Sequence, residues 1–273
     1  MRIHIQNPPP LADDPANPFI ITEAQVAEAA ARAGDTTTLA LSFGDDAAGF
    51  AAGIADAQML VTSTGQLVGR FPAHAPVLRL IFCTSAGVDR LLPFDWLPPG
   101  VALLNNRGVH GAKVGEYALM ALLMLAARVP AYATQQRTGL WKPHFTPTLR
   151  GRRLLVVGTG DLGAAVARQA RRHGVHITGV RARPADHPDF DVVLGPDGLD
   201  AALAETEFVL LACPLTPQTR NLLDRRRLGL LPAGAAVINV GRGALLDQEA
   251  LCDLLDQGHL SGAVLDVVTP EPL

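Results

Sequence analysis

Cysteine and lysine are scarce in this sequence of 273 residues. Its three cysteines, Cys83, Cys213 and Cys252, are isolated and odd in number, which argues against a disulfide framework and against a zinc site of the CxxC type. We therefore expect no metal centre and a reducing compartment, the cytoplasm. Only Lys113 and Lys142 are lysines, the formal net charge is −3, and acidic and basic residues are interspersed. This distribution favours neither nucleic acid nor an anionic membrane as a partner.

Long apolar runs and a secretory leader are also missing. No stretch reaches the ~18–20 uninterrupted apolar residues that a membrane-spanning helix requires. The N-terminal MRIHIQNPPP lacks the apolar core of a signal peptide, so we expect no membrane partner and no export. What the chain does contain is 48% hydrophobic residues, with a mean hydropathy of +0.21. This is enough apolar material for one large core or two smaller ones. The interspersed charges, which form no polybasic face, favour a small molecule as the ligand.

The first part of the chain alternates short apolar runs with a helix-forming stretch. We expect strands at 2–6, 59–63, 78–85 and 101–106 and a helix at 23–32. A proline-rich break at 93–100 leads us to divide the chain into a smaller α/β domain of residues 1–98 and a second domain of residues 99–273. Residues 114–129 are apolar all round, which predicts a helix buried between layers or domains.

A second series of βα units is predicted from Arg152 onward. Strands are expected at 152–158, 175–182, 208–214, 235–240 and 261–268, with a helix at 161–174 that ends at a glycine. Such alternation predicts a parallel, doubly wound sheet of the Rossmann type, with its ligand at the carboxyl ends of the strands. The predicted fold class is α/β, with two domains.

A glycine-rich motif lies between the predicted strand 152–158 and the predicted helix that follows. It reads Gly158-Thr159-Gly160-Asp161-Leu162-Gly163, the GxGxxG pattern of dinucleotide-binding turns. The first glycine permits the tight turn, the second lets the backbone approach a pyrophosphate, and the third allows close packing of helix on strand. An ordinary glycine-rich turn is the alternative, which the register of strand, loop and helix disfavours. We therefore expect a nicotinamide dinucleotide here.

Arginines follow the next predicted strand. At this point an NAD-binding site usually has a carboxylate for the ribose 2′-hydroxyl, whereas this chain has Arg181, with Arg183 two residues further on. A guanidinium can pair with a 2′-phosphate and stack on adenine. We therefore expect NADP(H) to be preferred, with NAD(H) possible. Two solvated surface arginines are the alternative, and for Arg183 alone the two interpretations are about equal.

Several blocks of the chain resemble the D-isomer-specific 2-hydroxyacid dehydrogenases in order and spacing. They are IFCTSAGVDRLL (81–92), NNRGVHGAKVGEYALMALLMLAARVP (105–130), LACPLTPQTRNLLD (211–224), INVGRGALLDQEAL (238–251) and GAVLDVVTPEPL (262–273). The resemblance covers most of the chain from about Val77 onward. It implies a flavodoxin-like substrate-binding domain at 1–98, an NAD(P)-binding Rossmann domain at 99–273, and a homodimer.

The resemblance also implies roles for individual residues. Arg242 matches the arginine that binds the substrate carboxylate and polarises the carbonyl, a role that suits a planar and permanently charged group. Glu271 matches the carboxylate that pairs with the catalytic histidine. The small residues Ser85, Ala86 and Gly87 match the loop whose backbone amides receive the substrate carboxylate.

Further matching positions lie on the cofactor side. Asp266 matches the residue that contacts the nicotinamide carboxamide, although an acid after an apolar strand could also cap the next segment. Cys213, Pro214 and Thr219 match positions beside the adenosine and its ribose, and the Val240 backbone matches a position near the nicotinamide. For Cys213 a small buried apolar side chain is an equally good interpretation.

The family's proton-donating histidine has no counterpart among the residues of this sequence. It would stand beyond Glu271 and its EPL block, whereas the eight histidines of this chain all lie before it. Either the polypeptide continues past Leu273 with that histidine and the last helix of the substrate domain, or it ends there. We expect the first, because an end directly after the last core strand would leave apolar sheet surface uncovered. His110, in the hinge segment, is the histidine to watch, although a local hydrogen bond explains it better.

Three functions compete at this stage. The first is an NADPH-dependent reductase that converts a small 2-oxo acid of the glyoxylate or hydroxypyruvate type to the D-2-hydroxy acid. The second is an NAD-dependent dehydrogenase of the D-3-phosphoglycerate type, for whose phosphate Arg70, Arg79 and Arg90 are available. The third is a dinucleotide-sensing binding protein without catalysis. Retention of both Arg242 and Glu271 favours an enzyme, because a sensor needs neither side chain.

Overall fold

The computed structural model describes residues 1–10, 17, 19–34 and 38–271. The chain divides into two compact units, Met1–Arg107 and Gly108–Leu273. The boundary predicted after residue 98 lies before the observed one. The prediction assigned the strand at 101–106 to the second unit. In the structure this strand, β5 (Ala102–Asn105), pairs with β4 (Leu80–Cys83) in the first unit.

The first unit contains a parallel sheet in the order β2-β1-β3-β4-β5. Its other strands are β1 (Arg2–Gln6), β2 (Ala40–Gly44) and β3 (Met59–Thr62), and its helices are α1 (Glu23–Ala33), α2 (Ala47–Ile54), α3 (Thr64–Leu67) and the 3-10 turns η1 (Asp89–Leu91) and η2 (Phe94–Trp96). This is the flavodoxin-like order of a doubly wound sheet. The predicted strands and helix of this unit are confirmed, with ends shifted by a few residues, and β2 is an addition.

The second unit contains a six-stranded parallel sheet in the order β11-β10-β9-β6-β7-β8. Its strands are β6 (Arg153–Val157), β7 (His176–Val180), β8 (Val192–Leu194), β9 (Phe208–Leu211), β10 (Ala236–Asn239) and β11 (Gly262–Leu265). The chain runs outward from β6 in one direction and then resumes on the other side of β6 with β9. This is the Rossmann arrangement, and it confirms the predicted doubly wound sheet.

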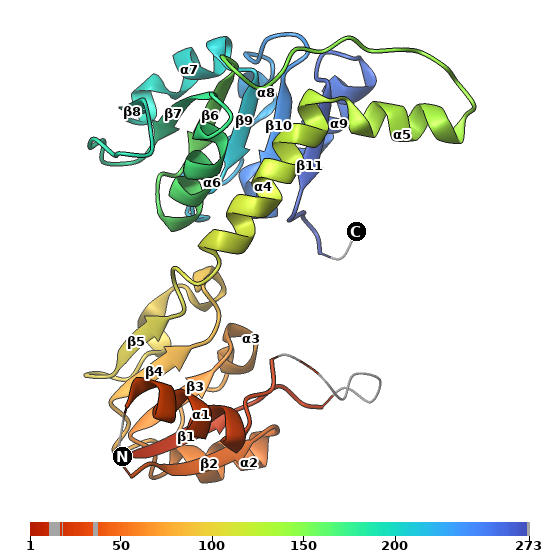
Figure 1. Ribbon diagram of the computed structural model, residues 1–273. Helices are drawn as coiled ribbons and strands as arrows, with labels where there is room; N and C mark the ends of the chain where they lie inside the picture. The colour runs from red at the N-terminus through yellow and green to blue at the C-terminus, as the bar shows by residue number, and fades with distance from the viewer. Residues whose placement is uncertain (11–16, 18, 35–37, 272–273) are drawn as a thin grey trace. The chain divides into compact units, whose positions relative to one another are not determined.

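Helices cover both faces of this second sheet (Figure 1). They are α4 (Gly111–Ala126), α6 (Asp161–Arg171), α7 (Leu199–Glu205), α8 (Arg225–Leu228) and α9 (Gln248–Asp256), with 3-10 turns η3 (Pro196–Gly198) and η4 (Gly243–Leu245), whereas α5 (Val129–Arg137) extends away from the sheet. Alternate strand residues face opposite sides. Leu154 and Val156 join a core with α4 and α6, whereas Leu155 and Val157 join a core with α7, α8 and α9.

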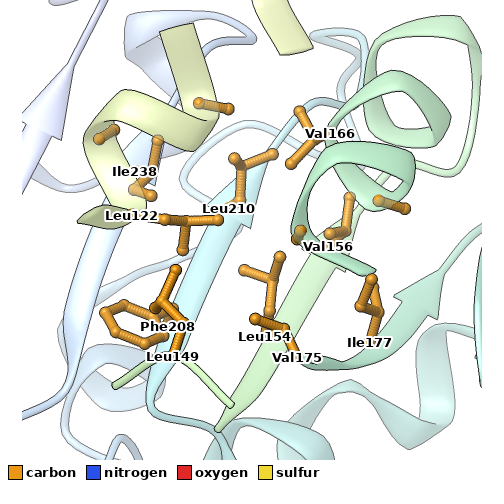
Figure 2. Close-up of a cluster of buried hydrophobic side chains, with 14 of the residues drawn as sticks. Leu122, Leu149, Leu154, Val156, Val166, Val175, Ile177, Phe208, Leu210 and Ile238 are labelled. Carbon is orange, nitrogen blue, oxygen red and sulfur yellow. The ribbon is translucent and has the colours of Figure 1, made fainter. Parts of the chain in front are cut away.

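The core under α4 and α6 is almost entirely aliphatic (Figure 2). Leu122 of α4, Val156 of β6 and Leu210 of β9 are fully buried in it. Because this core fixes α6 against β6, it also fixes the turn that joins them. The site discussed below therefore rests on a rigid scaffold.

The predicted helix at 114–129 corresponds to α4, which begins and ends three residues earlier than predicted. Arg128 adopts a left-handed conformation with φ 58°, and Pro130 follows in the first turn of α5. Together they set a bend of 62° between α4 and α5. Burial is also partial, because Met120 and Leu123 are each 44% exposed on α4.

No single helix among the described residues has both the length and the apolar character needed to cross a membrane, although α4 and the bent α5 meet that test as a pair.

Candidate active site

The predicted cofactor residues gather along one edge of the second sheet. All six strands are parallel, so the loops after them emerge at the same edge. Five of these loops carry the predicted residues: Gly158–Gly163 after β6, Arg181 and Arg183 after β7, Cys213–Thr219 after β9, Val240 and Arg242 after β10, and Asp266 and Glu271 after β11. The strand order reverses between β6 and β9, and ligands of doubly wound sheets bind at such a point.

The three glycines of the turn have three different environments. Gly158 has a φ of 102°, and a Cβ there would lie 2.6 Å from the Cys213 nitrogen. At Gly163 a Cβ would lie 1.9 Å from the Gly158 carbonyl oxygen, whereas at Gly160 a Cβ would meet nothing within 4 Å. The outer glycines are therefore required by turn geometry and packing. The middle glycine leaves open space, as a close approach of ligand to backbone requires.

The turn also leads into the amino end of a helix. Helix α6 begins at Asp161 with Gly160 as its N-cap residue, and no side chain caps its first turn. Unpaired backbone N–H groups and the positive end of the helix dipole favour an anion at this place. The buried Thr159 hydroxyl beside them has no hydrogen-bond partner among the described residues. The turn therefore fits a pyrophosphate, and it retains one unsatisfied polar group next to it.

The two arginines after β7 are exposed and carry no ion pair with a described carboxylate. The Arg181 backbone N–H donates to the Leu194 carbonyl at 3.1 Å. Its side chain is exposed to solvent. Two other arginines nearby are already engaged, since Arg168 pairs with Asp189 and Arg171 with Asp191. Among these four, position and pairing single out Arg181 and Arg183 as the cations open to a phosphate.

The loop after β9 is held by its own side chains. The Thr219 hydroxyl donates to the Pro214 carbonyl at 2.7 Å and accepts the Thr216 N–H at 2.7 Å. The Cys213 side chain packs on the core beneath α7 and α9, and burial raises the pKa of its thiol to about 11. The packing agrees with the interpretation of Cys213 as a small buried side chain, and its contact with the adenosine ribose stays a prediction.

Arg242 lies in a loop whose two flanking positions, Gly241 and Gly243, have no room for a side chain. A Cβ on Gly241 would lie 2.8 Å from Leu245, and one on Gly243 would lie 2.1 Å from the Val268 carbonyl oxygen. The Arg242 Nη1 donates to the Gly241 carbonyl at 2.8 Å, and the side chain remains half-buried. Between the two glycines, the guanidinium stands at the carboxyl end of β10.

Asn239 organises this loop, and the sequence analysis missed it. Its Oδ1 accepts the Gly241 N–H at 3.0 Å, and its Nδ2 donates to the Arg242 carbonyl at 2.9 Å. The side chain is fully buried, and Val240 beside it is buried as well. An asparagine that ends an apolar strand is the signal that could have found it.

The loop after β11 is clamped by a residue that the sequence analysis also missed. The Gln248 side chain donates to the Thr269 carbonyl at 2.6 Å and accepts the Thr269 N–H at 2.7 Å. Glu271 is exposed, and its Oε1 accepts the Val268 N–H at 3.3 Å. No local pattern predicts this pair of hydrogen bonds, because Gln248 and Thr269 lie 21 residues apart in the chain.

Asp266 begins that loop and lies near α4. Its backbone N–H donates to the Asn239 carbonyl at 2.9 Å, and its side chain is exposed. Burial, and secondarily the Asp266 carboxylate, raise the pKa of the Tyr117 phenol. The Tyr117 phenol of α4 therefore lies within electrostatic reach of the Asp266 carboxylate.

The predicted substrate loop lies in the first unit, at the carboxyl end of β4. The Ser85 Oγ accepts the Thr64 N–H at 3.2 Å, and Asn105 Nδ2 donates to the Ala86 carbonyl at 2.7 Å. Neighbouring segments on both sides therefore hold the loop, with small residues at 86 and 87. Among the residues that the structure describes, no three His, Cys, Asp or Glu side chains gather as a metal site would need.

Comparisons with known proteins find a family model and relatives that are similar to this chain. The family model for the NAD-binding domain of D-isomer specific 2-hydroxyacid dehydrogenases matches residues 119–273. Glyoxylate/hydroxypyruvate reductase B of Pectobacterium carotovorum is 32% identical over 81% of this chain and 71% of its own length. D-3-phosphoglycerate dehydrogenase of Methanocaldococcus jannaschii is 29% identical over 80% of this chain and 43% of its own.

A solved structure is also similar to this chain. The D-isomer specific 2-hydroxyacid dehydrogenase of Xanthobacter autotrophicus Py2, in complex with NADPH and MES, superposes with a TM-score of 0.79 at 29% identity. The superposition covers 100% of this chain and 82% of that one. With the Rossmann order, the three glycine environments and the Arg242 loop, these matches show that the chain belongs to the D-isomer specific 2-hydroxyacid dehydrogenases, a family of nicotinamide-dependent oxidoreductases.

Proposed function

We propose that this protein reduces a small 2-oxo acid of the glyoxylate or hydroxypyruvate type to the D-2-hydroxy acid with NADPH. The observation that carries the proposal is the Arg242 loop. Two tightly packed glycines and Asn239 hold a permanently charged guanidinium at the sheet edge that also holds the dinucleotide turn. A fixed cation at this place suits a carboxylate next to a reacting carbonyl. The glyoxylate/hydroxypyruvate reductase among the relatives supports the same substrate class.

The residues divide the chemistry between them. Bound NADPH supplies a hydride to the carbonyl carbon, and a proton must reach the carbonyl oxygen to complete the alcohol. Arg242 binds the substrate carboxylate and stabilises negative charge on that oxygen. The family resemblance implies that the amides of Ser85–Gly87 also take part in substrate binding, and Asp266 would orient the carboxamide of the nicotinamide. The proton would come from the histidine that the family resemblance implies and that has no counterpart among the residues of this sequence, and Glu271 would keep that histidine protonated and oriented.

The preference for NADPH depends on the arginines after β7. Arg181 and Arg183 are exposed without a described ion-pair partner, at the position where an NAD-specific site has a carboxylate. A 2′-phosphate would gain charge-assisted hydrogen bonds from either guanidinium. A carboxylate here would repel that phosphate instead. The NADPH present in the Xanthobacter structure supports the same cofactor.

A D-3-phosphoglycerate substrate is the second candidate, favoured by the Methanocaldococcus relative. It needs cations for its phosphate, and the first unit offers little support. Arg70 lies over the Phe50 ring at 5.4 Å, and Arg79 precedes β4, at the sheet edge opposite to the Ser85 loop. Of the three arginines considered, only Arg90 follows that loop. A sensor without catalysis is less well supported, because it has no use for Arg242 and Glu271 together.

The test is NADPH oxidation by the full-length protein with glyoxylate, hydroxypyruvate and 3-phosphohydroxypyruvate. We expect turnover with the first two, and we expect Arg242→Gln to abolish it while NADPH binding persists. Gln keeps a polar side chain of similar reach but lacks the charge. Turnover with the phosphorylated substrate alone would instead support the second candidate. Tight NADPH binding without turnover of any of them would contradict the proposal and favour a sensor.

The proposed assembly is a homodimer, and the proposed compartment is the cytoplasm. The dimer is supported by exposed apolar side chains on α4, α5 and the segment after them. The compartment is supported by three cysteines that are all free in the structure. Sedimentation of the purified protein tests the first proposal, and localisation of a tagged copy tests the second.

A further inference from the structure

One buried polar side chain of the second unit has no hydrogen-bond partner among the residues that the structure describes. Seven polar residues are buried in that part of the chain: His4, Gln6, Asn17, Thr62, Thr159, Thr206 and Asn239. Six of them have partners, and the Thr159 hydroxyl is the exception. Such a group calls for an explanation, because it has given up hydrogen bonds to water and gained none in return.

Packing accounts for the methyl group of Thr159 and leaves the hydroxyl unexplained. A Cβ built on Gly179 of β7 would lie 2.5 Å from the Thr159 Cγ2 and 2.8 Å from Cδ1 of the Phe190 ring. The methyl group therefore packs in the space that the glycine leaves beside Phe190. A valine at position 159 would fill that space equally well and would bury no hydroxyl.

Thr206 of the same unit shows how a buried threonine is ordinarily satisfied. Its hydroxyl lies 3.2 Å from the Arg153 carbonyl oxygen and 3.1 Å from the Phe208 carbonyl oxygen, and it donates to them. Thr206 stands at the amino ends of β6 and β9, whereas Thr159 follows the carboxyl end of β6. Ligands of doubly wound sheets bind at the carboxyl ends. The unsatisfied hydroxyl therefore stands at the ligand-binding edge.

The place of Thr159 in the glycine turn favours the adenosine ribose over the pyrophosphate as its ligand. The Gly158 N–H donates to the Val180 carbonyl of β7 at 2.8 Å, and Thr159 packs on Gly179, so this half of the turn rests on β7. The unpaired amides that suit a pyrophosphate belong to the other half, the first turn of α6. Arg181 directly follows Val180, and the 2′ position of the ribose is recognised at the end of this strand.

We propose that the Thr159 hydroxyl binds the adenosine ribose of the dinucleotide at its 2′ substituent. The inference rests on the proposed function, whose cofactor it requires, and it adds a side chain to which neither the glycine pattern nor the family resemblance gave a role. A hydroxyl both donates and accepts, so it can donate to a 2′-phosphate or accept from a 2′-hydroxyl. Because the hydroxyl is covered in the free chain, the turn adjusts locally as the ribose enters.

This contact gives one side chain opposite effects on folding and on binding. In the free protein the unsatisfied hydroxyl lowers stability, because an apolar group of the same shape would avoid its desolvation penalty. In the complex the hydroxyl gains a partner and contributes to affinity. Valine at position 159 should therefore stabilise the free protein and weaken the complex. A purely structural hydroxyl predicts the reverse, a less stable protein with unchanged affinity.

The test measures the melting temperature without ligand and the Kd for NADPH on the full-length protein. Thr159→Val should raise the Kd about 3–10-fold, the value of one hydrogen bond, with an unchanged or higher melting temperature. Thr159→Ser keeps the hydroxyl and removes the methyl group, so it should keep the Kd and lower the melting temperature. Thr206→Val is the matched control, and it should lower the melting temperature and leave the Kd unchanged.

A fragment of the cofactor separates the ribose from the pyrophosphate. Adenosine 2′-monophosphate carries the ribose and its 2′-phosphate but no pyrophosphate. We expect Thr159→Val to weaken its binding by the same factor as the binding of NADPH, because both ligands present the same 2′ substituent.

Two results would overturn the ribose contact. The first is an unchanged Kd for NADPH in Thr159→Val. The second is a weaker binding of NADPH without a weaker binding of adenosine 2′-monophosphate, because the hydroxyl would then meet the pyrophosphate. Turnover of glyoxylate by the unaltered protein judges the proposed function separately from either result. If the unaltered protein prefers NADH, the proposed cofactor fails, and a loss of about 3–10-fold in its affinity for NADH would still support the contact.

Discussion

Replacing Gly160 with alanine should weaken dinucleotide binding at least tenfold and leave the fold intact, whereas the same change at Gly163 should destabilise the fold itself. The two glycines are three residues apart in one turn and serve different purposes. A Cβ at Gly160 meets nothing within 4 Å, and a Cβ at Gly163 lies 1.9 Å from the Gly158 carbonyl oxygen. The pair therefore separates a contact with ligand from a contact within the protein.

The stability cost at Gly160 should be close to zero. Its φ of −77° is one that alanine adopts readily, and fewer unfolded conformations then favour folding by about 0.4–1 kcal/mol. Alanine is the poorer N-cap residue, which costs about the same amount. For the dinucleotide, a methyl group in the open space would separate the pyrophosphate from the backbone N–H groups. Losing one such hydrogen bond to a charged group costs about 1.5–3 kcal/mol, or about 10–100-fold in affinity.

The stability cost at Gly163 should be large. The clashing atom is a backbone oxygen of the same turn, so neither side can move without displacing β6 or α6. Overpacking of this kind costs about 3 kcal/mol or more. For a unit of 166 residues, counted from 108 to 273, this corresponds to a fall of roughly 6–12 °C in melting temperature.

The assay combines thermal unfolding with titration of NADPH by its fluorescence. Gly160→Ala should unfold at the temperature of the unaltered protein and bind NADPH at least tenfold more weakly. Gly163→Ala should unfold early even without ligand. Unchanged affinity in Gly160→Ala would refute the assignment of the open space to the pyrophosphate. An unchanged melting temperature in Gly163→Ala would refute the packing argument.

Three further predictions concern other parts of the molecule. Arg181→Glu should raise the Kd for NADPH about 10–100-fold and leave that for NADH unchanged or lower; equal effects in a titration of both would contradict a 2′-phosphate contact. Burial lowers the pKa of His4 in the fold, so the unfolded chain binds a proton more readily and stability should fall as pH drops below about 6.5. Urea unfolding from pH 8 to pH 5 should show a steeper loss for the unaltered chain than for His4→Asn, and parallel curves would argue against it. Gln248→Ala should speed hydrogen exchange at the Thr269 amide, and an unchanged rate by NMR would show that the clamp does not hold this loop.

Local patterns predicted the elements of the second unit well. Strand, glycine turn and helix at 152–174 each have a short-range signature, and β6 and α6 appear where those signatures stand. The helix at 114–129 was predicted to end three residues too late, because the composition stays apolar through the bend. The left-handed Arg128 has no signature, since arginine rarely adopts that conformation. The domain boundary was predicted too early because no local pattern shows that β5 pairs with β4. That pairing assigns β5 to the first unit.

The residues that organise the site were harder to predict than those that perform chemistry. Arg242 and Glu271 stand in blocks that a family resemblance identifies, but their roles stay predictions until tested. Asn239 and Gln248 act through backbone contacts that form only after folding. For Cys213 the two kinds of information differ. The family block at 211–224 suggests a contact with the cofactor, whereas the structure shows the side chain packed against the core.

The sequence by itself determined that this chain forms parallel βα units, carries a dinucleotide turn and belongs with the 2-hydroxyacid dehydrogenases. Periodicity, glycine spacing and residue type are local properties, so they can be read before folding. Tertiary structure alone decided which glycine of the turn is open to a ligand, which side chains hold the Arg242 and Glu271 loops, and that Trp141 and Phe145 stand exposed. These depend on distances between segments remote in the chain, which packing of the sheet and its helices sets.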